Sequence, residues 1–194
     1  MKKINIKKQY KKAFTFIKKS KNFIYTIIAI FCAFTLIGFF IPIPDQLSNQ
    51  ILELLRQILE QTKDMTSKQL TSFIFFNNLK SSIFGMILGI FFGIFPIFAS
   101  LVNGYLLGFV ASLSVKSEGV LSLWRILPHG IFELPAVFIS LGLGLKIGSF
   151  IFQKQKIKSL KHFLTNSLRV FLLIVIPLLI IAAIIEGILI SLVR

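Results

Sequence analysis

The segment Ser81–Gly93, SSIFGMILGIFFG, places a small residue at every fourth position of an otherwise apolar run. The small residues are Ser81, Gly85, Gly89 and Gly93. This spacing puts small side chains on one face of an α-helix, where the backbone of a second helix can approach closely. The surrounding run, from Ser81 to Val115, carries no charged residue. Such a run is typical of helices that cross a lipid bilayer, so the segment predicts tightly packed membrane helices.

The same spacing recurs in three later apolar runs. Its small residues are Ser100, Gly104, Gly108 and Ser112, then Ala136, Ser140, Gly144 and Gly148, and finally Ala183, Gly187 and Ser191. One such pattern is a weak signal because Gly and Ser are common in membrane helices, whereas four in succession indicate a helix bundle. The first apolar run offers only Ala29 and Ala33, so we expect it at the periphery. The same faces could also join two copies of the chain.

The composition of the whole chain indicates a membrane protein. Of its 194 residues, 55% are hydrophobic and 22 are Phe, and the mean hydropathy is +0.84. These values lie beyond those of soluble domains. The net charge of +15 comes from 22 Lys and Arg against 7 Asp and Glu. Nine lysines precede residue 22, directly before an uncharged run. The positive-inside rule explains this placement as cytoplasmic topology, so we do not expect nucleic-acid binding.

Four apolar blocks predict five membrane spans. The blocks are residues 23–41, 81–115, 131–152 and 170–192. A crossing needs roughly 20 residues, so the second block is too long for one straight span. The basic segments 1–22 and 153–169 should both be cytoplasmic, which requires an even number of crossings between them. The second block is therefore predicted to be a hairpin that turns near Phe95–Leu101, around Pro96. The resulting fold is an all-α, polytopic five-helix bundle in the cell membrane, with a cytoplasmic N-terminus and an extracytoplasmic C-terminus.

Two amphipathic segments flank these spans. In residues 1–22, Ile6, Tyr10, Phe14 and Ile17 recur at helical spacing among lysines. They indicate either a helix on an anionic inner leaflet or a simple basic topology tail. In residues 45–72, which we predict to be an extracytoplasmic amphipathic helix, the apolar stripe is Leu47, Ile51, Leu54 and Ile58. This stripe either packs on the bundle or docks a partner or second copy. The first span then covers residues 23–41, and residues 73–194 form a four-helix core.

The stretch Pro128–Pro135, PHGIFELP, brings charge into this apolar chain. If a helix begins at Pro128, His129 and Glu133 lie one turn apart on the same face. Glu186 lies at a similar depth in the last span. Ionisable groups at this depth are costly unless they are paired or hydrated. We therefore predict a polar cluster in the outer half of the bundle, formed by Asn77, Asn78, Arg125, His129, Glu133 and Glu186. The cluster either holds the helices in register or contacts a lipid headgroup, an ion or a partner.

The sequence contains no recognisable catalytic or metal-binding set. It has neither an HExxH nor a GxSxG motif, and no serine or cysteine nucleophile is evident at the depth of His129. Its one cysteine, Cys32, lies in the first apolar run, which excludes an intrachain disulfide and a cysteine-based metal site. A closed zinc site usually needs four nitrogen or sulfur ligands. We therefore expect no enzymatic activity, no cofactor and no bound metal.

At these residues the sequence resembles the stage II sporulation protein M family of membrane proteins. The matching stretches are Phe76–Phe95, Asn103–Gly108 (NGYLLG), Pro128–Ala136 (PHGIFELPA) and Ala182–Gly187 (AAIIEG). The resemblance covers roughly residues 73–191, while residues 1–72 match only in layout. It implies an integral membrane protein without catalytic activity of its own. The sporulation member resembles a scaffold for two peptidoglycan-degrading partners, stage II sporulation proteins D and P. The resemblance gives the matching residues His129, Gly130, Glu133, Pro135 and Glu186 no agreed chemical role.

Two functional hypotheses follow. The first is a non-enzymatic membrane scaffold that recruits partner proteins, which would be cell-wall hydrolases if the sporulation role carries over. The alternative is a transporter or lipid-handling protein with an outer-half polar site at His129, Glu133 and Glu186. Membrane lipids, protein partners and a second copy of the chain are the expected contacts.

Overall fold

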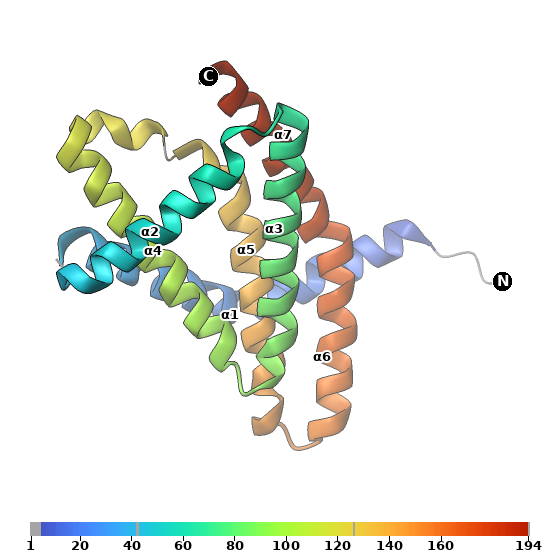
Figure 1. Cartoon of the computed structure of the whole chain (residues 1–194). Helices are drawn as coiled ribbons and strands as arrows, with labels where there is room; N and C mark the ends of the chain where they lie inside the picture. Colours follow the sequence, from blue (N-terminus) through green and yellow to red (C-terminus); the bar gives the residue numbers. More distant parts are fainter. Residues whose placement is uncertain (1–4, 42, 126, 194) are drawn as a thin grey trace.

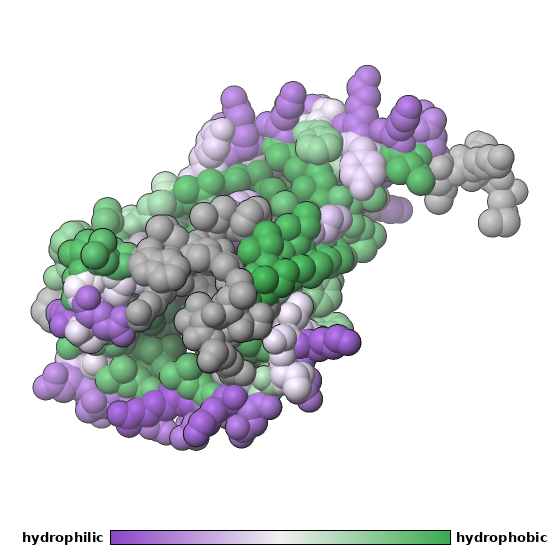
Figure 2. Space-filling view, turned by 90° about the horizontal axis from the view of Figure 1, so that it is seen from above, coloured by the Kyte–Doolittle hydropathy of each residue, from purple (hydrophilic) through white to green (hydrophobic). Residues whose placement is uncertain are grey.

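The computed structural model describes the backbone of residues 5–41, 43–125 and 127–193. Within these ranges, the side chains of residues 124–132, 187 and 189–193 are not described. The described residues are almost entirely helical and contain no β-strand (Figure 1). Five stretches are long and apolar enough to cross a membrane, which confirms the predicted all-α bundle: Ile6–Phe40, Ser67–Ile90, Ile94–Glu118, Glu133–Phe152 and Lys156–Glu186. In Figure 2, hydrophilic residues gather along two opposite edges of the molecule with hydrophobic residues between them.

Helix α1 (Ile6–Phe40) joins the basic N-terminal segment to the first span without a break. Asn5 caps it, because the Asn5 Oδ1 accepts a hydrogen bond from the backbone N–H of Lys8 at 3.1 Å. Its 35 residues rise about 1.5 Å each, which exceeds the ~30 Å hydrocarbon core. The lysine-rich first half can therefore lie outside the bilayer while the apolar second half crosses it.

The segment after α1 forms two helices where the sequence predicted one over residues 45–72. Helix α2 runs over Asp45–Lys63, and helix α3 over Ser67–Ile87. Thr66 lies between them and forms a capping box with Gln69 at the start of α3. The Thr66 hydroxyl accepts a hydrogen bond from the Gln69 N–H at 3.4 Å, and the Thr66 N–H donates one to Gln69 Oε1 at 2.9 Å. None of the α2 residues is buried. The helix therefore adds nothing to the core, and the interpretation that its apolar stripe packs on the bundle is wrong.

The hairpin between the second and third spans turns earlier than predicted. After α3, a 3₁₀ turn (Leu88–Ile90) leads into Phe91–Gly93, and helix α4 (Ile94–Glu118) begins directly afterwards. The predicted turn at Phe95–Leu101 is therefore wrong. Gly93 supplies the left-handed backbone that the turn needs, with φ of 75°. Pro96 instead lies in the first turn of α4. Backbone N–H groups in a first turn have no carbonyl partner within the helix, so a proline there costs no hydrogen bond.

Helix α5 (Leu127–Gly148) occupies the centre of the bundle and packs against α1, α3, α4 and α7. A 3₁₀ segment, Val120–Arg125, connects α4 to it, and another, Ser149–Phe152, follows it. Pro135 lies inside α5 and does not end the helix. Buried apolar residues on its inner faces include Leu141, Leu143 and Ile147. The predicted basic loop 153–169 is mostly helical, since α6 spans Lys156–Val170.

Helix α6 continues through a π-helical turn, Phe171–Val175, into α7 (Ile176–Val193). Pro177 explains the wider turn, because it cannot donate to the carbonyl four residues earlier and its ring displaces that carbonyl. Phe171 and Leu179, on this continuous helical segment, pack with Phe16, Met86 and Leu143 in the hydrophobic core. The core thus brings the first and last parts of the chain together.

The expectation that the first span lies at the periphery is wrong, because α1 packs closely along α4. A Cβ atom on Gly104 would collide with the carbonyl oxygen of Phe31, and one on Gly108 with that of Thr35. Ser100 Oγ donates a hydrogen bond to the Ile27 carbonyl at 2.9 Å. The small residues of α4 permit this approach, so α1 needs few small residues of its own.

A second close contact joins α5 to α3 and to the turn that follows α3. Gly89 faces the backbone of Gly144, and Gly148 faces that of Gly93. Ser140 Oγ donates to the Ser82 carbonyl at 2.7 Å. The packing glycines proposed from sequence that lie at such approaches are Gly85, Gly89, Gly93, Gly104, Gly108, Gly144 and Gly148. Gly187, the remaining one, lies outside the described side chains.

Candidate functional site

The six residues of the predicted polar cluster come from different elements of the bundle. Asn77 and Asn78 lie in α3, where Asn77 is exposed and Asn78 half-buried. Asn77 lines a surface groove together with Phe76 and Lys80. Arg125 ends the segment before α5 and His129 lies in the first turns of α5, but their side chains are outside the described residues.

The side chains of the two acids in this predicted cluster are among the described residues. Glu133 lies in α5 and Glu186 in α7, and both are half-buried. Helices α3, α5 and α7 pack against one another, so the elements that carry these acids and the two asparagines are neighbours. The association of the six side chains stays a prediction.

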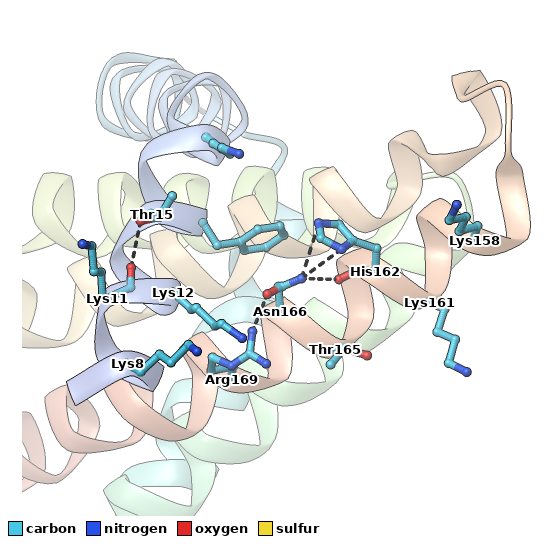
Figure 3. A pocket seen from close by; sticks show the side chains of 12 residues that line it. Lys8, Lys11, Lys12, Thr15, Lys158, Lys161, His162, Thr165, Asn166 and Arg169 are labelled. Atoms are coloured by element: carbon cyan, nitrogen blue, oxygen red, sulfur yellow. Dashed lines mark hydrogen bonds between the residues drawn. The ribbon is translucent and has the colours of Figure 1, made fainter. Parts of the chain in front are cut away.

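A different polar feature, which we call the basic groove, lies between the first half of α1 and α6 (Figure 3). It has a volume of about 760 Å³. Seven cationic side chains line it: Lys8, Lys11, Lys12, Lys19, Lys158, Lys161 and Arg169. Phe16, His162 and Asn166 also contribute to the lining, and no carboxylate stands among these described residues. The groove therefore presents concentrated positive charge.

Arg169 is held in place at one end of this groove. Its Nε donates to Gln9 Oε1 at 2.8 Å, which ties α6 to α1. Its Nη1 donates to Asn166 Oδ1 one turn away, and the Asn166 amide donates to the His162 carbonyl at 2.8 Å. The guanidinium is thus oriented by its neighbours before any ligand arrives.

A buried cation lies behind the groove on α5. Lys146 is only 8% exposed, and its Nζ donates to the Lys19 carbonyl at 3.0 Å. The rings of Phe16, Phe23 and Phe163 surround the ammonium, with centroids 5.0, 5.5 and 5.4 Å from Nζ. Cation–π contacts at these distances offset part of the cost of burying the charge. Lys146 therefore joins α5 to both walls of the groove.

The sequence placed the two basic segments on one side of the membrane but did not predict that they touch. Phe16 and His162 meet edge to face with centroids 6.2 Å apart, and Phe16 is buried. The available signal was the high density of lysines in both segments, with three in residues 156–161 and four in residues 7–12. Among the described residues, no three His, Cys, Asp or Glu side chains gather in a way that could hold a metal ion.

The third candidate surface is the apolar stripe of α2. Leu47, Leu54 and Ile58 are exposed by 51, 60 and 50% of their surface. The exposure of large aliphatic side chains along one helix face makes the stripe a candidate contact surface.

Comparison with known proteins agrees with this architecture. The family model of stage II sporulation protein M matches residues 27–189. The match begins inside α1 and so includes most of the first span and all of α2, beyond the 73–191 indicated by the motifs. No curated protein and no solved structure matches the chain. With five apolar helices and a family match over most of its length, the chain belongs to the stage II sporulation protein M family of membrane proteins.

Proposed function

We propose that this protein is a non-enzymatic membrane scaffold that binds a helix of a partner protein through the apolar stripe of α2. The observation that carries the proposal is that α2, a 19-residue helix with a regular apolar stripe, buries none of its residues. A helix that gives nothing to the core and still exposes large aliphatic side chains is suited to intermolecular contact.

The pattern of the stripe favours a helical partner over a lipid surface. Leu47, Ile51, Leu54 and Ile58 follow the 4, 3, 4 spacing of a heptad repeat, with isoleucine at the a positions and leucine at the d positions. This arrangement favours two-stranded helix pairing. Helices that lie in a membrane surface typically carry aromatic residues and an excess of Lys and Arg. Within α2 there is no aromatic residue, and Asp45, Glu53 and Glu60 outnumber Arg56 and Lys63.

Quantitative co-purification from native membranes tests the proposal. The first variant replaces the stripe residues Leu47, Ile51, Leu54 and Ile58 with Gln. The matched control places Gln at four positions off the stripe on the same helix, Asn49, Glu53, Arg56 and Glu60. A photo-crosslinker at Leu54 in the otherwise unchanged chain identifies the bound segment.

The scaffold proposal expects one protein to co-purify with the unchanged chain and with the control. Its recovery should fall at least about tenfold in the stripe variant, because burying even one of the four aliphatic side chains contributes about 1.5 kcal/mol or more. The Leu54 cross-link should map to a helix of that protein. A cross-link only to a second copy of this chain would show that the stripe joins two copies of the protein and does not recruit a different one. Equal recovery from both variants would show that the stripe is not the docking surface.

A further inference from the structure

We propose that the basic groove between α1 and α6 binds the phosphate of an anionic phospholipid headgroup. The groove is open to the surface and large enough for a headgroup, at about 760 Å³. This inference does not depend on α2 and would stand if the scaffold proposal failed.

No acidic side chain stands among the described residues that line the groove. All seven acids lie at residues 45, 53, 60, 64, 118, 133 and 186. The segments that build the groove, residues 5–40 and 156–170, contain none of them. Seven cations brought together in this way repel one another, and a bound anion lowers that repulsion. The folded groove should therefore favour an anionic ligand.

The side chains at one end of the groove converge as a phosphate site requires. Figure 3 shows Lys8 and Lys12 of α1 extending toward Arg169 of α6, while Lys11 points away. Arg169 uses one N–H on Gln9 and one on Asn166, which leaves three of its five N–H donors for a ligand. A guanidinium fork matches two phosphate oxygens, and the two ammonium groups add charge without fixing geometry.

The position of the groove along the chain selects a lipid over a free ion. Lys19 lies only a few residues before the apolar half of α1, and Arg169 directly precedes the apolar run that starts at Val170. Basic residues at the ends of membrane spans stand at the level of lipid headgroups. The buried Phe16 also gives the groove an apolar wall. Such a wall would contact the glycerol and upper acyl chain of a lipid but would contribute nothing to a free phosphate.

The test titrates the full chain in neutral detergent with a short-chain phosphatidylglycerol, a short-chain phosphatidylcholine and inorganic phosphate at one ionic strength. The groove variant replaces Lys8, Lys12 and Arg169 with Gln. The matched control removes the same charge outside the lining, at Lys7, Lys18 and Lys154. A third variant, Lys8→Gln with Lys12→Gln, keeps the Arg169 contacts that join α1 to α6, and thermal unfolding without lipid checks that each variant folds.

Phosphatidylglycerol should bind the unchanged chain more tightly than phosphatidylcholine or phosphate. Its Kd should rise about 30-fold in the double variant and about 100-fold or more in the groove variant, since each cation near the headgroup contributes about 1 kcal/mol, which is about fivefold in Kd. The control should stay within about twofold because its lysines stand outside the site. Equal weakening in the control and groove variants would reveal only a diffuse basic surface and overturn the proposal. Tighter binding of inorganic phosphate would assign the groove to a free anion instead.

Discussion

Lys146 shows how a single charged residue is accommodated inside an apolar bundle. Its aliphatic stem is buried in α5, and its ammonium meets a backbone carbonyl of α1 and three phenylalanine rings. Phe16 and Phe23 belong to α1 and Phe163 to α6, so one side chain ties three helices together. Only 8% of the residue is exposed, and the aromatic rings replace part of the hydration that its ammonium group loses.

We predict that Lys146→Ala lowers the free energy of unfolding by about 2–4 kcal/mol, since it removes a buried stem and its cation–π contacts and leaves a cavity. Thermal or denaturant unfolding in detergent measures the change. The control is Lys154→Ala, an exposed lysine that should change stability by less than about 0.5 kcal/mol. Equal effects of the two substitutions would mean that the ring cage contributes no stability.

Contacts between pairs of helices decide how the elements assemble. The contact of α5 with the turn between α3 and α4 depends on glycine at both sides, since Gly89 faces Gly144 and Gly148 faces Gly93. The α1–α4 contact uses the same device, with Gly104 and Gly108 under the backbone of α1. These two interfaces lie on different helix pairs, so one packing rule holds the first four spans together.

We predict that Gly89→Ala destabilises the protein by about 2–4 kcal/mol, because the added methyl group would meet the Gly144 backbone and force the turn after α3 away from α5. An unobstructed Gly→Ala change in a helix would instead stabilise it by up to about 1 kcal/mol. The control is Ser81→Ala, at an exposed position of α3, which should stay within about 0.5 kcal/mol. Unfolding in detergent compares the variants. A stabilising Gly89→Ala would show that the helices do not approach closely there.

At the level of elements, the sequence predicted the number of spans because length and charge determine it. The hairpin turn was misplaced because Pro96 was taken as the turn, although a proline also fits the first turn of a helix. The position of the first span was misjudged because only its own small residues, Ala29 and Ala33, were considered, whereas the glycines of α4 allow the close contact. The basic groove could not be predicted, since Gln9 and Arg169 meet only in the folded chain.

For the whole molecule, the contact between the two basic segments constrains the topology. The first half of α1 and α6 share the basic groove and the Gln9–Arg169 hydrogen bond, so they must lie on the same side of the membrane. This agrees with the even number of crossings inferred from charge. From the positive-inside rule we predict that this side faces the cytoplasm and that α2, one crossing away, lies outside.

We predict that single cysteines reveal this arrangement in intact cells when they are placed in a Cys32→Ser background. A cysteine at Lys154, exposed near the start of α6, should react with a membrane-impermeant maleimide only after the cells are opened. A cysteine at Gln61, exposed on α2, should react before they are opened. The Cys32→Ser chain without an added cysteine gives the background labelling. Labelling of the Lys154 position in intact cells would show that both basic segments lie outside the cell, because they cannot separate without breaking the contact between α1 and α6. The phosphate of the lipid proposed for the groove would then come from the outer leaflet.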